Sequence, residues 1–385
     1  MKNILLCDAN FCVLPIAQSL MSKGNNLAVL GGLEQDPAHK IADKSIILDY
    51  SNVELLSQHI QDAKYDAVVP GCNDRSYLSL AAIAQKFNYV GFDSNEVVQT
   101  IHLKDRFRAF AEMKGYPVPQ AVSELTQVST LNFPIMIKPV DSFSGKGINK
   151  VETLKDIEKY WNKAKEFSYT KKVIAEEFVE GKLYSHSAFI KNKKIVVDFF
   201  VNEYCSVYPY QVNSSNLATQ LSTKVQKEVQ NWTEQFAKDL NLVDGLIHTQ
   251  FISNNESFWL VEVARRCPGD LYSQLIQKST GVNYAELYAM PFLGEELPNK
   301  IEKKHQRFFS RHTVSVDKEC IFISSGFNER YKSIQNVQLK YSGQKMKPAP
   351  FDKSGIYFIE HEDATEMEEK TEKLKEYVVI DTLDI

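Results

Sequence analysis

The stretch GLIHTQFISNNESFWLVEVARRCPGD, residues 245–270, decides how the rest of the chain is interpreted. It predicts two strands joined by the polar turn SNNE. Because side chains alternate along a strand, pairing across this turn directs Gln250 and Glu262 to the same side. Arg265 and Arg266 follow just beyond the second strand. A carboxylate, an amide oxygen and a guanidinium in one place suit Mg²⁺ held against phosphate oxygens, although a solvated hairpin face fits the same residues.

The composition describes an ordinary globular protein of two or three domains. The chain has 385 residues, of which 43% are hydrophobic and 24% are charged. Its formal net charge of −4 gives no electrostatic reason to expect a nucleic-acid partner. No apolar run reaches the roughly 18 residues that a membrane span requires, so no membrane partner is expected.

Cysteine usage indicates a reducing compartment. The six cysteines lie far apart in the sequence and form no C-x-x-C pair. This spacing argues against both a zinc site and a disulfide framework. We therefore expect a cytoplasmic protein.

The first 100 residues alternate short apolar strands with helices, which predicts a doubly wound parallel sheet. Ligands usually bind beyond the carboxyl ends of such strands. Those ends carry Asp8 and the group Asn73, Asp74 and Arg75. No G-x-G-x-x-G follows the first strand, which argues against a nicotinamide-dependent oxidoreductase.

Two lysines precede a glycine-rich loop. Lys104 lies at the start of a helix expected within residues 102–120, and Lys138 lies in the apolar strand FPIMIKP. The loop DSFSGKGINKV follows this strand directly. Glycines, hydroxyls and a lysine can surround a phosphate, although a Gly-Lys-Gly turn is more often a plain hairpin. The loop differs from G-x-x-x-x-G-K-[ST], so it is not a P-loop.

The strand VIAEEFV, residues 173–179, leads into a hinge at Gly181. Alternation places Glu176 on one face and Glu177 and Val179 on the other. Free backbone groups at such a hinge can bind the edge of an adenine, and a nearby carboxylate can bind the ribose hydroxyls.

In their order along the chain, these features resemble the ATP-grasp superfamily, preceded by the three-layer domain that its members usually carry. The resemblance covers about residues 1–295 and implies ATP and Mg²⁺ as cofactors, with Mn²⁺ as an alternative ion. It implies that Arg266 and Lys138 are catalytic and that Gln250 and Glu262 hold the metal ion. The residues implied to bind ATP are Lys104, Lys138, Ser144, Gly145, Lys146, Gly147, Glu176, Glu177, Phe178 and Val179.

The sequence departs from the pattern of the superfamily at three positions. Gln250 stands where the first metal ligand is commonly Glu, and Ala264 stands where E-x-N-x-R has Asn. Leu183 stands where a Glu often follows the hinge glycine. Fewer protein ligands for a hard cation must be offset by phosphate oxygens and water.

The resemblance implies a ligase that activates a small-molecule carboxylate as an acyl phosphate and couples it to an amine. Alternatives are a carboxylase that uses carboxyphosphate and a nucleotide-binding regulator that has lost the chemistry. ATP, the acid and the amine are the expected partners, and a homodimer remains open. The residues expected near the substrates are Asn73, Asp74, His248 and Arg265.

The expected fold is α/β and α+β in three parts. A doubly wound domain spans residues 1–100, and a two-subdomain ATP-grasp domain spans 101–300, with a mobile lid at about 118–180. A small α+β segment spans 301–385, with strands expected near 307–314, 337–341 and 355–360 and then a closing helix.

Overall fold

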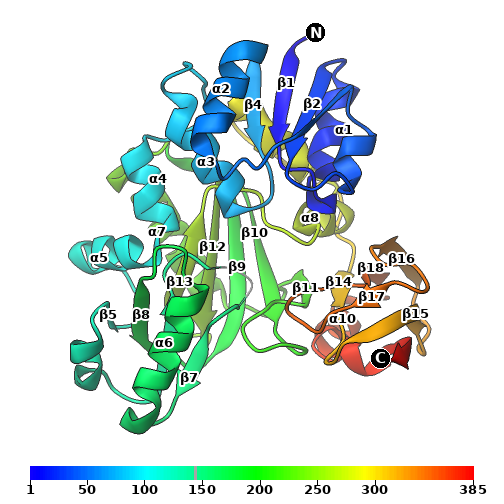
Figure 1. Ribbon diagram of the computed structural model, residues 1–385. Helices are drawn as coiled ribbons and strands as arrows, with labels where there is room; N and C mark the ends of the chain where they lie inside the picture. The colour runs from blue at the N-terminus through cyan, green and yellow to red at the C-terminus, as the bar shows by residue number, and fades with distance from the viewer. Residues whose placement is uncertain (143–144) are drawn as a thin grey trace.

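The amino-terminal sheet is parallel and has helices on both faces, as the sequence predicts. The computed structural model describes residues 1–142 and 145–385 (Figure 1). The strands of this sheet, in the order β3-β2-β1-β4, are β1 (Asn3–Cys7), β2 (Asn26–Gly31), β3 (Lys44–Ile47) and β4 (Ala67–Pro70). The accompanying helices are α1 (Leu14–Ser22), α2 (Val53–Ala63), α3 (Asp74–Ala84) and α4 (Asn95–His102). Neighbouring residues of β1 belong to two different apolar clusters, so both faces of the sheet are buried.

A small antiparallel sheet forms the lower left lobe of Figure 1. Its strand order is β5-β8-β6-β7, and helix α6 packs on it. The elements are β5 (Ala121–Val122), β6 (Ile135–Pro139), β7 (Asn149–Val151), α6 (Ile157–Phe167) and β8 (Val173–Glu177). Helix α5 (Lys104–Lys114) precedes this sheet and ends at Gly115, whose φ of 67° is in the left-handed region. The helix expected within residues 102–120 is therefore closed by Gly115, as the sequence predicts.

The central sheet has eight strands and includes strands from both sides of residue 300. Its order is β13-β12-β9-β10-β11-β14-β18-β16. The strands before residue 300 are β9 (Lys182–Lys191), β10 (Lys194–Tyr204), β11 (Ser214–Leu217), β12 (Gly245–Ser253) and β13 (Phe258–Ala264). The later strands are β14 (Phe309–Val314), β16 (Ser333–Gln338) and β18 (Gly355–Glu360). The helices between them are α7 (Thr223–Asp239), α8 (Tyr272–Thr280) and α9 (Tyr284–Ala289).

The last part of the chain contains a second sheet that the sequence did not predict. Its order is β17-β15-β19, with β15 (Cys320–Phe327), β17 (Lys345–Met346) and β19 (Val378–Asp384). The expected closing helix is present as α10 (Ala364–Thr371), followed by the short α11 (Leu374–Tyr377). The strand expected near 337–341 lies earlier, at β16, because its register is set by pairing with β18. Among the described residues, no helix is both long and apolar enough to cross a membrane.

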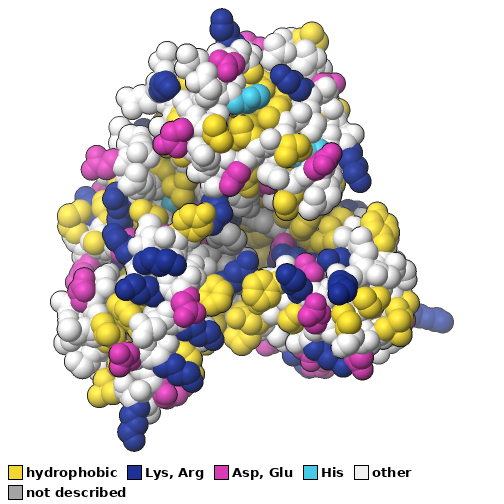
Figure 2. All heavy atoms as spheres, in the orientation of Figure 1, with side chains coloured by type: hydrophobic (Ala, Val, Ile, Leu, Met, Phe, Trp, Pro, Cys, Tyr) yellow, Lys and Arg dark blue, Asp and Glu magenta, His cyan; other side chains and the backbone are white. Residues whose placement is uncertain are grey.

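The amino-terminal sheet, the small antiparallel sheet and the last part of the chain form three lobes, which surround a hollow on the face shown in Figure 2. Lys and Arg side chains gather along the edges of this hollow. Helix α9 packs against α1, so the segment after β13 also supports the amino-terminal sheet. The carboxyl ends of β1 and β4 are held close together. A Cβ atom on Gly71 would lie 2.2 Å from the Cβ of Asp8 and 2.6 Å from its Oδ2.

This close approach predicts the effect of a substitution. We expect Gly71→Ala to lower the free energy of unfolding by about 1–3 kcal/mol, because the added methyl group forces buried backbone apart. Urea-induced unfolding measures the change. The control is Gly326→Ala, whose Cβ would meet no atom within 4 Å and which should change stability by about 0.5 kcal/mol or less. Equal effects of the two substitutions on stability would show that the close approach of Gly71 to Asp8 does not constrain the fold.

Candidate nucleotide and metal site

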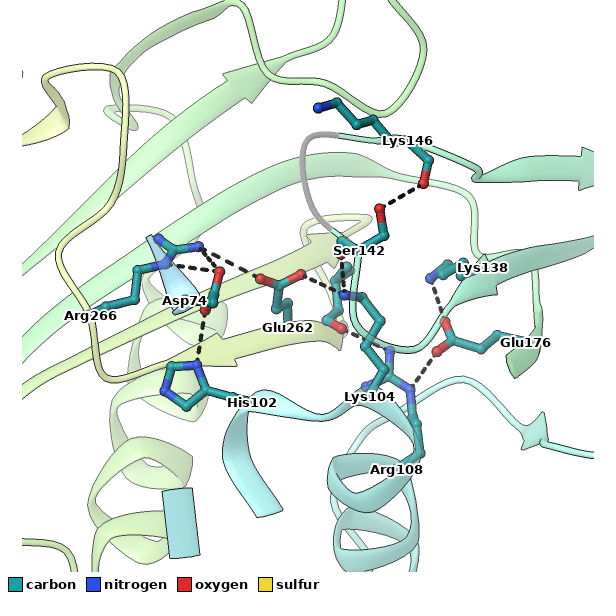
Figure 3. A network of polar contacts seen from close by, with 11 residues as sticks. Asp74, His102, Lys104, Arg108, Lys138, Ser142, Lys146, Glu176, Glu262 and Arg266 are labelled. Carbon is teal, nitrogen blue, oxygen red and sulfur yellow. Dashed lines mark hydrogen bonds and ion pairs between the residues drawn. The ribbon is translucent and has the colours of Figure 1, made fainter. Parts of the chain in front are cut away.

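The hairpin that opens the sequence analysis forms as expected. Gln250 on β12 and Glu262 on β13 are register partners. Glu262 then contacts two cations: its Oε2 lies 3.5 Å from Lys104 Nζ, and its Oε1 lies 3.9 Å from Arg266 Nη2. Figure 3 shows these side chains in one network. The structure therefore brings together a lysine, a carboxylate and an arginine that the sequence analysis selected separately.

Lys104 connects three parts of the chain. It is the first residue of α5, and its Nζ donates a hydrogen bond of 3.1 Å to the carbonyl oxygen of Ser142. The same Nζ faces Glu262. Lys104 thus joins α5, the loop after β6 and the central hairpin, which places it where a phosphate between these parts would lie.

Lys138 lies in a buried ionic cluster beside this network (Figure 3). Its Nζ is 2.5 Å from Glu176 Oε2, and Arg108 Nε is 2.9 Å from Glu176 Oε1. Burial opposes ionisation of Glu176, but Arg108 and Lys138 lower its pKa to about 2. Burial also lowers the pKa of Lys138, and Glu176 opposes that shift. The Glu176 carboxylate is therefore engaged with two cations rather than free for a ribose.

The hinge offers backbone rather than carboxylates. Glu177 Oε1 accepts hydrogen bonds from the backbone N–H (2.9 Å) and side-chain amide (2.7 Å) of Asn132. The Phe178 N–H donates to Pro134, and Lys150 Nζ lies 4.3 Å from the centre of the Phe178 ring. The Val179 N–H donates no hydrogen bond within the described residues. Glu176 and Glu177 are therefore already bonded within the protein, whereas the Val179 N–H leaves a backbone donor for an adenine. The expected ribose contact stays a prediction.

The glycine-rich loop needs its glycines. Ser144 lies outside the described residues. Gly145 and Gly147 have φ values of 71° and 76°, and a Cβ on Gly145 would lie 2.8 Å from the carbonyl oxygen of Tyr210. Lys146 Nζ lies 5.4 Å from the centre of the Phe351 ring. The loop therefore reaches from the small sheet to the central sheet and to the last part of the chain.

Arg266 is held by the amino-terminal domain. Its Nε and Nη2 each lie 3.2 Å from Asp74 Oδ2, and His102 Nδ1 lies 2.9 Å from Asp74 Oδ1. Burial opposes ionisation of Asp74, but Arg266 and His102 hold its pKa well below the usual range. Asp74 was expected near a substrate. In the structure it holds Arg266, and its place near a substrate stays a prediction.

Two other residues expected near the substrates, Asn73 and His248, also form hydrogen bonds within the protein. Asn73 Oδ1 accepts from the N–H of Ser76 and caps α3, and its Nδ2 donates to Asp8 and Tyr50. His248 Nδ1 lies 2.8 Å from Ser187 Oγ. Burial, and then the neighbouring Arg266, lower the pKa of His248 well below its usual value, so this imidazole is neutral at pH 7.

Arg265 corrects the sequence analysis. Only 3% of the residue is exposed, and its Nε lies 2.8 Å from Asp93 Oδ2. Its terminal nitrogens donate to the carbonyl oxygens of Leu246 and Val243. The two arginines follow the end of β13 and point to different sides: Arg265 enters the core, whereas Arg266 faces Glu262.

The sequence analysis missed three residues of the network. Arg108 follows Lys104 by one helical turn, and this i, i+4 spacing was the available signal. His102 contacts Asp74 from a different helix. Glu203 on β10 accepts a hydrogen bond of 2.5 Å from Gln250 Nε2. Nothing in the sequence indicates this last pair, because its members are 47 positions apart.

The donors present fit a divalent cation only in part. Glu262 contributes a carboxylate and Gln250 an amide oxygen, which are suitable oxygen ligands for Mg²⁺. Within residues 1–142 and 145–385, no group of three or more His, Cys, Asp or Glu side chains is arranged to hold a metal ion. A cation at Glu262 therefore needs further oxygens, and nucleotide phosphates next to Lys104 would supply them.

Part of the chain matches a known protein family. Residues 131–274 match the family profile of the ATP-grasp domain, so this part of the chain is an ATP-grasp domain. The chain is 27% identical over 284 residues to a formate-dependent phosphoribosylglycinamide formyltransferase of Prochlorococcus marinus, a match that covers 69% of each protein.

Solved structures share the whole fold. An L-amino acid ligase from Bacillus licheniformis superposes with a TM-score of 0.81 at 17% identity, covering 100% of this chain and 99% of that one. The biotin carboxylase domain of Hydrogenobacter thermophilus 2-oxoglutarate carboxylase, in complex with MgADP and bicarbonate, gives a TM-score of 0.78 at 12% identity. That match covers 100% of this chain and 91% of the other. The expected α/β and α+β fold with an ATP-grasp domain is confirmed.

The structural role of Arg265 can be tested. We expect Arg265→Ala to lower the free energy of unfolding by about 3–5 kcal/mol, because it leaves the buried carboxylate of Asp93 without its cation. Chemical denaturation measures the loss. Arg330→Ala, at an exposed position, is the control and should change stability by about 0.5 kcal/mol or less. An Arg265→Ala protein of normal stability would show that the pair has no structural role.

Proposed function

We propose that this chain is an ATP-dependent ligase that activates a small-molecule carboxylate as an acyl phosphate and couples it to an amine, giving ADP and phosphate. The observation that carries the proposal is the single network in which Glu262 contacts both Lys104 and Arg266. Phosphoryl transfer depends on positioned charge rather than on a protein nucleophile, and this network places charge from three segments around one point.

Lys104 and Lys138 are the proposed phosphate contacts. Lys104 can exchange its contacts with Glu262 and the Ser142 carbonyl for phosphate oxygens, because these contacts are long, at 3.5 Å and 3.1 Å respectively. Lys138 is held by Glu176, which favours the charged form of this buried lysine. Together they would offset negative charge on a triphosphate.

Arg266 is the proposed stabiliser of the acyl phosphate and of the tetrahedral oxyanion formed when the amine attacks. Its side chain is only 14% exposed, and Asp74 holds two of its nitrogens. A guanidinium fixed in advance stabilises developing charge without reorganisation. The loop at Gly145–Gly147 would cover this site and exclude the water that hydrolyses acyl phosphates.

Mg²⁺, or Mn²⁺ in its place, would be held by Glu262 and Gln250 and would neutralise charge on the phosphates. A cytoplasmic location is also part of the proposal. It is supported by the six cysteines, each of which is a free thiol in the structure.

The proposal predicts the kinetics of two variants. We expect Glu262→Ala to abolish ATP turnover and Arg266→Ala to lower kcat by about 10²-fold or more. The assay is ADP release with ATP and Mg²⁺ in the presence of amino acids, dipeptides or uronic acids as candidate acids. Dependence of turnover on bicarbonate would instead indicate the carboxylase chemistry.

The matched control is Glu256→Ala, which removes an exposed carboxylate from the turn of the same hairpin. This variant should retain the wild-type rate. Unchanged rates in both the Glu262 and the Arg266 variants would remove the assignment of this site. Absence of acid-stimulated ADP release in the wild type would favour the nucleotide-binding regulator.

A further inference from the structure

The cation site contains one carboxylate where two negative charges would bind a divalent ion better. Glu262 is charged, but its register partner on β12 is the neutral amide of Gln250. Hard cations such as Mg²⁺ and Mn²⁺ bind most tightly to sites with several negatively charged oxygens. The question is what turns the oxygen of that amide, rather than its nitrogen, toward the ion.

Glu203 lies next to Gln250 from a strand that is not its neighbour. It belongs to β10, and β9 runs between β10 and β12 in the sheet. Only 7% of Glu203 is exposed, and its Oε2 lies 2.5 Å from Gln250 Nε2. The residue of β9 that pairs with Gln250 is Ser185. Its small side chain leaves room for Glu203 to reach across the strand.

This hydrogen bond sets the orientation of the Gln250 amide. The amide nitrogen of Gln250 is the donor of this bond and a carboxylate oxygen of Glu203 is the acceptor, so the amide oxygen points away from Glu203. The amide oxygen is then the atom left for a cation beside Glu262. If Gln250 turned the other way, two oxygens would face each other at Glu203 and the amide nitrogen would face the cation.

We infer that Glu203 is a positioning residue of the cation site: it accepts a hydrogen bond from the Gln250 amide nitrogen and so holds the amide oxygen toward the ion. The inference rests on the proposed function, because it concerns the same cation. Outer partners that orient metal ligands typically contribute about 10–100-fold to metal affinity.

The arrangement has a specific chemical consequence. Positions 203 and 250 together hold one carboxylate and one amide, joined by a hydrogen bond. Exchanging the two residues keeps one carboxylate, one amide and the hydrogen bond between them. It also moves the carboxylate nearer to Glu262. Gln250→Glu alone instead places two carboxylates against each other in a buried position, which costs stability or forces one of them to be protonated.

The test is the affinity of Mn²⁺ for the protein saturated with ADP, measured by electron paramagnetic resonance of the free ion. We expect Glu203→Gln to weaken Mn²⁺ binding about tenfold or more. The double variant Glu203→Gln with Gln250→Glu should return to within about threefold of wild type. Thermal unfolding of each variant without metal checks that the fold is intact.

Two further variants keep the test decisive. Glu203→Asp retains the charge and should bind Mn²⁺ more tightly than Glu203→Gln. Asp198→Asn is the matched control, because Asp198 is a carboxylate on the same strand that binds His186 and Gln230 instead, and it should bind Mn²⁺ as wild type does.

Wild-type affinity in Glu203→Gln, or no recovery in the double variant, would overturn the inference and leave the proposed function standing. A wild-type protein that binds neither ADP nor Mn²⁺ in the presence of ADP would overturn both.

Discussion

The contact between Lys104 and Glu262 joins the parts of this protein that form the proposed nucleotide site. Lys104 begins the helix that precedes the small sheet, Glu262 lies on the last strand of the central hairpin, and the Ser142 carbonyl belongs to the glycine-rich loop. At 3.5 Å, with Glu262 31% exposed, the pair is an ion pair that solvent screens and that anions can replace. In the proposed function, a triphosphate and a divalent cation would satisfy both charges at once, because the phosphates would bind the lysine and the cation would bind the carboxylate.

Exposure separates the ion pairs of the site into two kinds. Arg265 with Asp93, and Arg108 with Glu176, have side chains exposed by 5% or less. Such pairs fix the fold, because breaking one leaves a buried charge without compensation. Arg266 with Asp74 and Lys104 with Glu262 have side chains exposed by 13–31%, so solvent and ligands can reach them. Glu176 belongs to the structural kind and also holds Lys138, one of the two proposed phosphate contacts.

Local signals predicted the parts of the fold that depend on alternation and on turns. The apolar strands of the first 70 residues and the pairing of Gln250 with Glu262 both follow from the spacing of side chains. The sheet that contains β15 and β19 was missed, because its strands are weakly patterned and are held by a pairing more than 50 residues apart. Arg265 was assigned wrongly because two consecutive arginines look alike in a sequence, whereas only packing shows which one enters the core. Glu203 could not be found at all without the order of the strands.

The central claim is that Lys104, Lys138 and Glu262 surround one nucleotide–metal complex between the glycine-rich loop and the central hairpin. A crystal structure of the protein with ADP and Mg²⁺ tests it most directly. The account predicts the adenine beside the Val179 backbone, phosphate oxygens within hydrogen-bonding distance of both lysine Nζ atoms, and the ion on the Glu262 carboxylate. A nucleotide bound elsewhere, with the contact between Lys104 and Glu262 still intact, would contradict it.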